Sequence, residues 1–289
     1  MKKPLRKALL IVLSLCMLIV VVPISTVSAS TKDNYLSSFS ISKKTIYKGN
    51  GVNISLNSAK KDSSGLVITF VIKNSSKKNY SISAHEYAIN NLMAGGTTYG
   101  SDVTVPKGKK AKLTIKVDKS WFKENGIKTF KKFDVIFWAY CDYMKEWDSG
   151  QVSFSTNKDN KKGYYKPSKK ALFSDENMSI GYISKKNDTY KFYVQNKTDM
   201  ERRWTVGNCS VNDWSYDLGS CKYDLYSKPI LSGCYAIFDL SVDKGFKKEN
   251  SIKSVKKIEF NIEFEGGFDS DNNHFDAISS ENVVLKTKQ

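Results

Sequence analysis

The chain has 289 residues, 40% of them hydrophobic, and its 46 lysines and arginines outnumber its 29 aspartates and glutamates, giving a formal net charge of +17. Only two histidines are present and no two cysteines have CxxC spacing, so the composition argues against a zinc site. No helix-turn-helix, zinc-finger or aromatic–basic RNA-binding pattern accompanies the positive charge, which argues against binding to nucleic acid.

The first 29 residues predict a secretory signal peptide. Four basic residues precede an apolar run over 8–22, and Val27 and Ala29 occupy the −3 and −1 positions of a cleavage site after Ala29. Two alternatives remain. The run barely has the length to stay as a membrane anchor, and a lipoprotein site at Cys16 has the bulky Leu15 before it.

Cleavage removes four basic residues and no acidic ones, so the formal net charge falls from +17 to +13. The mature chain then has no membrane span, and we expect it outside the cell, in solution or associated with the cell wall. A positive field of this size favours anionic polymers or surfaces, and salt should weaken the attraction. A lysine-coated surface with no specific partner is the plainer interpretation.

The mature chain begins with a polar lead-in at 30–44 and continues into a first repeat at 45–157. Within that repeat, segments 52–56 and 66–74 have the character of strands and flank a turn-rich stretch. Residues 110–118 end in strict apolar alternation, which is typical of a half-buried strand.

The segment 118–140 recurs at 243–265, so each residue has its counterpart 125 positions later (243 − 118 = 125). Each copy contains a short stretch that predicts one or two helical turns, which Asp118 or Asp243 can cap. A strand follows in both copies. The chain therefore contains an internal duplication, with a linker at 158–168 and a second repeat at 169–289.

Successive short strands with no long helix favour an all-β protein of two antiparallel β-sandwiches, each with one short helical turn late in the repeat. The signature residues of the first repeat are Asn74 at a strand end, Asn90 after an apolar residue, the strand from Gly108, Gly126 after the helical turn, and the strand 133–137. This pattern resembles the tandem immunoglobulin-like domains of unknown function in secreted proteins and lipoproteins of Gram-positive bacteria. The resemblance implies an extracellular β-sandwich and supplies no catalytic residue.

Four cysteines remain after signal cleavage, and an even number in an exported chain favours disulfides. A Cys209–Cys221 bond would close the shortest loop and is the preferred pairing. Cys141 is then either free or joined to Cys234 across the two repeats.

Two groups of aromatic and apolar residues are candidate surfaces. In the first repeat, Ile136, Trp138 and Tyr140 occupy the strand face that is polar in the second repeat, so the other repeat, a partner or a ligand must cover them. In the second repeat, aromatic residues crowd the stretch before Pro229 and could bind a sugar or a protein, or fold back over the sandwich. These are Trp214, Tyr216, Tyr223 and Tyr226.

Neither histidine predicts catalysis. His85 lies in a strand and His274 in a polar loop, and neither accompanies a nucleophile motif. The acidic run from Asp269 opens like a calcium loop, but its sixth position is His274 and its twelfth is Ser280, so we predict a hairpin loop there. We therefore expect no catalytic residue, no metal and no cofactor.

The sequence predicts a secreted, non-catalytic binding or adhesion module at or near the bacterial cell envelope. Its expected partner is an anionic cell-wall polymer, a polysaccharide or another extracellular protein. A structural spacer or envelope component without a specific ligand is the alternative, and an accessory module of a carbohydrate-active enzyme, or a hydrolase, ranks third.

Overall fold

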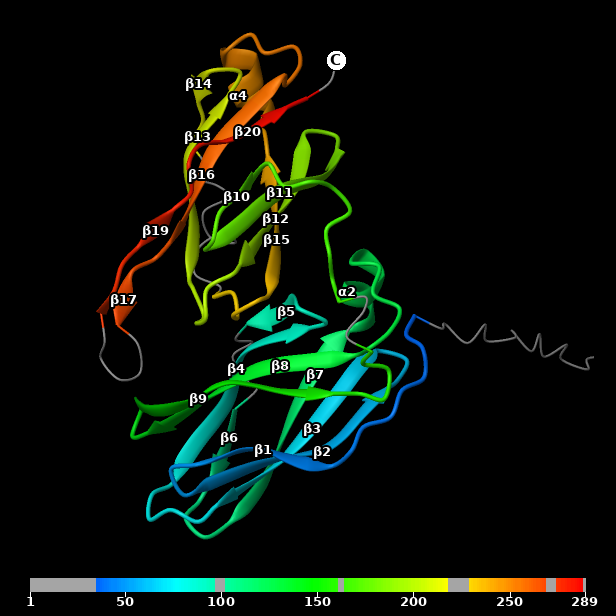
Figure 1. The fold of residues 1–289 in the computed structure, drawn as a ribbon, viewed down its shortest axis with the longest axis vertical. Helices are drawn as coiled ribbons and strands as arrows, with labels where there is room; N and C mark the ends of the chain where they lie inside the picture. The colour runs from blue at the N-terminus through cyan, green and yellow to red at the C-terminus, as the bar shows by residue number, and fades with distance from the viewer. Residues whose placement is uncertain (1–34, 97–101, 161–163, 218–228, 269–273, 288–289) are drawn as a thin grey trace, which may run out of the picture. The chain divides into compact units, whose positions relative to one another are not determined.

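The secondary structure is almost entirely β. The computed structural model describes residues 35–96, 102–160, 164–217, 229–268 and 274–287. These residues contain many short strands and only two helices, α2 (Lys119–Glu124) and α4 (Lys244–Glu249) (Figure 1). The prediction of an all-β protein with one short helix late in each repeat is confirmed.

The first sheet is formed by strands of the first repeat in the order β1-β2-β3-β7. In β7, Leu113, Ile115 and Val117 are buried while the residues between them are exposed, as the sequence alternation predicted. The bounds are β1 (Lys44–Gly49), β2 (Val52–Lys61), β3 (Gly65–Asn74) and β7 (Lys110–Asp118).

The second sheet contains strands of both repeats in the order β10-β11-β12-β15-β5-β4-β8-β9, with β6 beside β4. The two sets meet where Tyr235 of β15 lies opposite Leu92 of β5 in parallel pairing. The bounds are β4 (Tyr80–Ile89), β5 (Leu92–Gly96), β6 (Asp102–Val105), β8 (Lys132–Cys141), β9 (Met144–Ser155), β10 (Phe173–Ser174), β11 (Met178–Lys186), β12 (Thr189–Asn196) and β15 (Tyr235–Ser241).

The remaining strands belong to the second repeat. A third sheet has the order β14-β13-β16-β19, with β20 also beside β16, and β17 pairs with β18. All pairings between described strands are antiparallel except that of β15 with β5. The bounds are β13 (Trp204–Val211), β14 (Trp214–Ser215), β16 (Lys257–Phe264), β17 (Gly267–Phe268), β18 (His274–Phe275), β19 (Ile278–Ser279) and β20 (Val283–Lys286).

Each repeat encloses its own hydrophobic core. Phe70 in the first and Phe192 in the second occupy matching positions, and both are fully buried. Their rings lie 5.2 Å from Phe137 and 4.9 Å from Phe260, respectively. Ile136 and Ala88 of the first repeat belong to the second core, so residues 35–289 form one compact unit by their contacts.

A buried asparagine holds the same loops in both repeats. Asn74 and Asn196 lie 122 residues apart (196 − 74 = 122) and are fully buried. Each amide donates to two backbone carbonyls and accepts from one backbone N–H, with distances between 2.7 and 3.0 Å. The partners are Lys78 O, Val105 O and Ser76 N for Asn74, and Met200 O, Ile230 O and Thr198 N for Asn196.

A second pair of asparagines makes matching bonds in the two repeats. Asn90 joins the hairpin turn after β4 to the segment after α2, and Asn212 joins the hairpin turn after β13 to the segment after α4. Asn90 and Asn212 both have a φ of 51°, which asparagine tolerates better than most residues. Each side chain donates to one carbonyl and accepts from two backbone N–H groups of that segment. The partners are Thr129 O, Lys131 N and Lys132 N for Asn90, and Ser254 O, Lys256 N and Lys257 N for Asn212.

We predict that Asn74→Ala and Asn196→Ala each lower the free energy of unfolding by about 2–4 kcal/mol, because buried backbone groups lose their hydrogen-bond partners. Urea denaturation followed by circular dichroism measures the change. The exposed Asn282→Ala is the matched control and should shift it by no more than about 0.5 kcal/mol. Buried variants as stable as this control would contradict the role of the two asparagines.

Candidate binding surface

A tight hairpin at the end of β13 carries Trp214. Asn212 and Asp213 have φ values of 51° and 69°, which fits a two-residue turn of type I′, and Val211 and Trp214 lie opposite each other at its base. Trp214 is 54% exposed. Because the Asn212 side chain also bonds to the segment 254–257, the hairpin and that segment are fixed beside each other.

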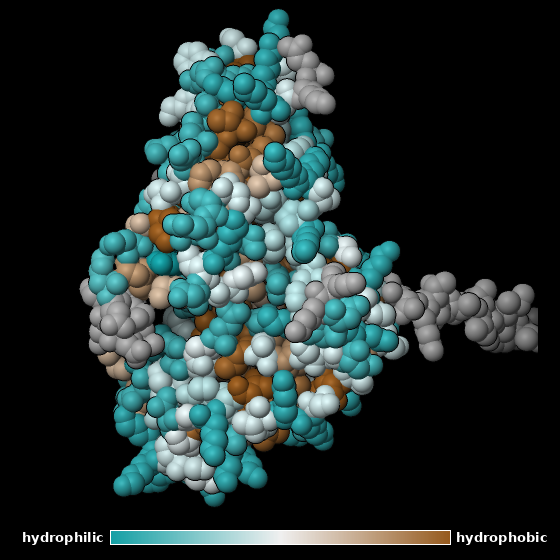
Figure 2. Space-filling view, viewed as in Figure 1, coloured by the Kyte–Doolittle hydropathy of each residue, from teal (hydrophilic) through white to brown (hydrophobic). Residues whose placement is uncertain are grey.

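A groove of about 800 Å³ lies beside Trp214 and is lined largely by polar and basic residues. A second hollow of about 590 Å³ continues from it, since Ser251, Ile252 and Lys253 line both. In Figure 2, mainly hydrophilic side chains surround the place of β14 and α4, while a hydrophobic patch lies where Figure 1 draws β20. We call the two hollows together the basic groove, which is defined by Trp214, Lys244, Lys247, Lys248, Lys253, Lys256, Lys257 and Lys286.

The charge of the basic groove is only partly neutralised. Lys247 pairs with Asp188 at 2.8 Å, and Lys257 pairs with Asp213 and, at 3.1 Å, with Glu259. These hydrogen bonds raise the pKa of Lys257, with that to Asp213 contributing most. The other lysines are exposed and form no ion pair within the described ranges; they are Lys244, Lys248, Lys253, Lys256 and Lys286.

Asp243, which lies beside the basic groove, caps the N-terminus of α4. The Asp243 carboxylate accepts a hydrogen bond from the Phe246 N–H at 3.0 Å and caps the helix. This bond is the main cause that lowers the pKa of Asp243. The basic groove combines an exposed indole with exposed ammonium groups, an arrangement that can stack on a sugar ring and attract phosphate or carboxylate groups.

The matching place in the first repeat is covered. Asn90, Asn91 and Leu92 correspond to Asn212, Asp213 and Trp214, and Leu92 is only 1% exposed. The carbonyls of Asn90 and Asn91 accept hydrogen bonds from the N–H groups of Tyr165 and Tyr235 at 2.8 and 2.7 Å. In the second repeat, no described backbone N–H bonds to the carbonyls of Asn212 and Asp213, so this end stays open within the described residues.

Tyr216 belongs to the core rather than to the basic groove. It is 6% exposed, its hydroxyl donates to Ser241 O at 2.7 Å and accepts from Asp243 N at 3.0 Å, and its ring packs on Phe246 at 4.6 Å. Of the two predicted binding aromatics that the structure describes, Trp214 lines the groove and Tyr216 does not. Tyr223 and Tyr226 lie outside the described residues.

The cysteines form no disulfide among the described residues. Cys141 is partly exposed at the end of β8, and Cys234 is 1% exposed, with burial raising the pKa of its thiol. The proposed cross-repeat bond between them is not formed. Cys221 lies outside the described residues, so the pairing of Cys209 with Cys221 stays a prediction.

The second candidate face lies where residues of the two repeats pack together. Ile136 is 4% exposed within the second core, Trp138 is partly buried against that core, and Tyr140 lies 6.2 Å from Trp138. Trp138 also stacks on His85, with ring centroids 3.4 Å apart, and contacts the Lys145 ammonium at 4.2 Å.

His85 sits at a β-bulge, since the pairing of β4 with β8 skips from Ala84 to Glu86. It is 8% exposed, and neither ring nitrogen has a hydrogen-bond partner. Although Glu86 lies 3.8 Å from Nε2, burial, together with the positive charges of Arg203 and Lys145, lowers the pKa of His85 to about 4. His85 is therefore a neutral ring packed on Trp138 at neutral pH.

The described residues offer no metal site and no membrane-spanning helix. Within the described ranges, no group of three or more His, Cys, Asp or Glu side chains is arranged to hold a metal ion. Neither α2, α4 nor any other described helix has the length and apolar character of a membrane span. His274 is exposed and lies 3.6 Å from Asp276.

Sequence reasoning missed most of the basic groove. It considered only a surface coated with lysine, although the stretch 244–257 alone contains six lysines, and this local density was the available signal. Lys286 gave no such signal, because only the pairing of β20 with β16 brings it beside Lys257.

Comparisons with known proteins identify no family. No protein-family model and no curated protein matches the sequence. Red sea bream transglutaminase shares 11% identity at a TM-score of 0.24 over 83% of this chain, which spans 32% of that protein's chain. A conserved domain protein from Bacillus anthracis shares 13% identity at a TM-score of 0.24, covering 89% of this chain and 94% of that one. At these TM-scores, the similarity supports no conclusion about the fold or the function of this chain.

We predict that Tyr216→Phe lowers the free energy of unfolding by about 1–2 kcal/mol, because the Asp243 N–H and the Ser241 carbonyl lose a buried partner. Trp214→Ala should change it by less than about 0.5 kcal/mol, because Trp214 is exposed. Chemical denaturation of both variants measures this. A larger loss for Trp214→Ala than for Tyr216→Phe would reverse the assignment of surface and core.

We predict that His85 makes stability fall on acidification. Its pKa is about 4 in the folded protein and 6.5 in the unfolded chain, so the unfolded chain binds the proton first. The stabilisation is full above pH 6.5 and is lost as the pH falls from 6.5 to 4. By pH 5 the free energy of unfolding should have fallen by about 1–2 kcal/mol. His85→Gln should lack this share of the pH dependence in denaturation curves. An NMR titration midpoint of His85 near 6.5 would contradict the prediction.

Proposed function

We propose that this chain is an exported, non-catalytic binding protein that attaches to an anionic glycopolymer at or near the bacterial cell envelope. The observation that carries the proposal is the basic groove, where an indole that is 54% exposed lies beside several lysines that form no ion pair with a described residue. The polymer's sugar rings stack on Trp214, and its phosphate or carboxylate groups lie against the lysines.

Export and fold belong to the same proposal. The first 29 residues have the pattern of a secretory signal, and the net positive charge suits an acidic wall outside the cell. The mature chain is two tandem immunoglobulin-like sandwiches. Two separate cores and asparagines that make matching bonds in both repeats support this arrangement.

The open end of the second repeat supports a binding role over that of a plain spacer. Its counterpart in the first repeat is covered through Tyr165 and Tyr235, whereas Trp214 stays exposed. A spacer needs no large exposed aromatic residue at the matching position. A protein partner would also fit an open end, but the unpaired lysines favour a polyanion.

The test is sedimentation of the mature protein with purified Gram-positive cell walls, either intact or stripped of their phosphate polymers. We expect binding to intact walls only. Trp214→Ala should weaken it about tenfold at every salt concentration, as the loss of one stacked aromatic ring implies. The triple variant Lys253→Gln/Lys256→Gln/Lys286→Gln should weaken it about tenfold in 0.05 M salt and little in 0.5 M.

The matched control is Lys107→Gln/Lys109→Gln/Lys112→Gln, which removes three exposed lysines from the first repeat and changes the net charge equally. It should bind like the unaltered protein. Equal losses for both triple variants, with no effect of Trp214→Ala, would leave only diffuse attraction and support the spacer. Equal binding to stripped walls would contradict the proposal that the ligand is an anionic polymer and would indicate a wall protein instead.

A further inference from the structure

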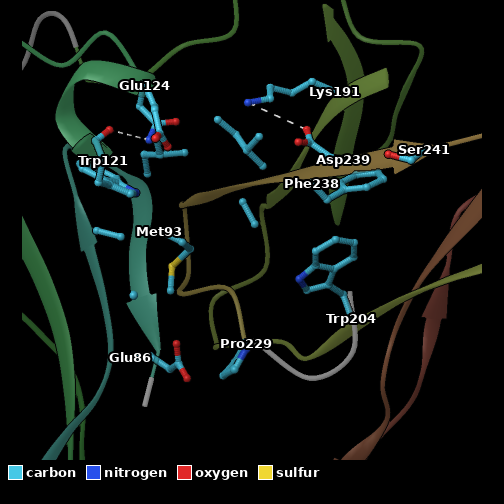
Figure 3. A pocket seen from close by; sticks show the side chains of 16 residues that line it. Glu86, Met93, Trp121, Glu124, Lys191, Trp204, Pro229, Phe238, Asp239 and Ser241 are labelled. Atoms are coloured by element: carbon cyan, nitrogen blue, oxygen red, sulfur yellow. Dashed lines mark hydrogen bonds and ion pairs between the residues drawn. The ribbon is translucent and has the colours of Figure 1, made fainter. Parts of the chain in front are cut away.

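A hollow of about 570 Å³ lies beside β5, α2 and β15, and Trp204 forms part of its wall (Figure 3). Figure 3 shows Glu86 and Glu124 at its opposite ends, and Asp239 already pairs with Lys191 at 3.9 Å. A ligand pocket holds its ligand through a few polar groups that converge on one place. The described residues of this hollow offer no such set, whereas the hairpin between β8 and β9 carries a clearer feature.

Tyr143 has a backbone conformation that aromatic residues rarely adopt. Asp142 and Tyr143 form the two-residue turn between β8 and β9, with φ values of 49° and 66°, and Cys141 lies opposite Met144 at its base. Every other described non-glycine residue with a positive φ is an asparagine, an aspartate or a serine. A bulky side chain is strained in this region, so the turn itself does not explain why a tyrosine stands here.

Tyr143 and Met144 form the tip of this hairpin, and both are exposed. Tyr143 is 101% exposed and Met144 is 71% exposed, more than any other large hydrophobic residue that the structure describes. A stable contact with a folded protein buries about 800 Å² on each partner, far more than two side chains on a convex turn provide. The hairpin tip suits a soft surface that the two side chains can enter.

Two loops are held next to the hairpin. The Lys78 ammonium group lies 2.7 Å from the Glu146 carboxylate, just after the tip, and the Lys107 N–H donates to Asn79 Oδ1 at 2.9 Å. The loops that follow β3 and β6 therefore lie beside the turn, and Figure 1 draws all three toward the lower left of the molecule.

The charge around the hairpin tip is positive. The two loops expose three lysines that form no ion pair with a described residue, namely Lys77, Lys107 and Lys109. In the stretch 141–148, Glu146 and Asp148 are neutralised by lysines, which leaves the charge of Asp142. An exposed tyrosine and methionine among free ammonium groups match the headgroup region of an anionic bilayer.

We propose that the hairpin tip binds the surface of a bilayer that contains anionic phospholipid. Tyr143 and Met144 enter the headgroup region, where tyrosine rings are favoured, and the three lysines of the loops lie against the lipid phosphates. The site shares no residue with the basic groove and does not depend on polymer binding there.

The experiment is cosedimentation of the mature protein with phosphatidylcholine vesicles that contain either about 30% phosphatidylglycerol or none. With the anionic lipid, we expect half of the protein to bind at a lipid concentration on the order of 0.1 mM, and without it at least about twentyfold weaker binding. Tyr143→Asn should weaken binding at least about threefold, because it removes the ring from the interface. The same variant should raise the midpoint of urea denaturation, because asparagine suits the turn, so its loss of binding cannot come from unfolding.

The contribution of the lysines is tested with two triple variants. Lys77→Gln/Lys107→Gln/Lys109→Gln should weaken binding at least about twentyfold in 0.05 M salt, since each lysine near an anionic surface contributes about fivefold. The matched control, Lys166→Gln/Lys170→Gln/Lys186→Gln, removes three exposed lysines outside the first repeat and changes the net charge equally. It should bind like the unaltered protein.

Three results would overturn the proposal: full binding by Tyr143→Asn, equal losses for both triple variants, or equal binding to vesicles without phosphatidylglycerol. A dimer in lipid-free solution that Tyr143→Asn dissociates would also overturn it and make the tip a contact between two copies of the chain. Purified walls carry no bilayer, so these results and those of the wall sedimentation stand or fall separately.

Discussion

Four asparagine side chains fix the loops on which the rest of the structure depends. Asn74 and Asn196 close the end of one strand in each repeat, and Asn90 and Asn212 join a hairpin to the segment after the helix. A buried amide can satisfy several backbone groups at once, and no apolar residue can replace it. The same network in the second repeat holds the lysine segment beside Trp214, so the candidate binding surface follows from a constraint of the fold.

Much of the fold was predictable from the sequence, because the relevant signals are local. Apolar alternation in 110–118 marked a strand with Leu113, Ile115 and Val117 inward, and the repeated stretch after Asp118 and Asp243 marked the two short helices. The left-handed residues after these helices, Gly126 and Ser251, have φ values of 64° and 52°, so the position tolerates a serine.

The sites were less predictable, because they depend on contacts between distant residues. Tyr216 and Trp214 are near neighbours in the sequence and equally aromatic, yet one is buried through a hydroxyl bonded to Ser241 and the other is exposed. The hollow beside Trp204 draws its walls from both repeats, which meet through the pairing of Tyr235 with Leu92 and through the packing of Ala88 and Ile136 in the second core. The hydrophobic periodicity of a single segment cannot predict such contacts between distant parts of the chain.

The duplication also bears on whether strands of separate copies of this chain could pair end to end. Within one chain, β15 adds to the edge of β5, and its counterpart β7 forms the edge of the first sheet. Yet β7 presents Lys110 and Lys112 where β15 has Tyr235 and Ile237. Charged edge residues discourage strand addition between molecules. A head-to-tail contact that does not close on itself would build an open-ended fibre, and a lysine-bearing edge strand disfavours that kind of contact.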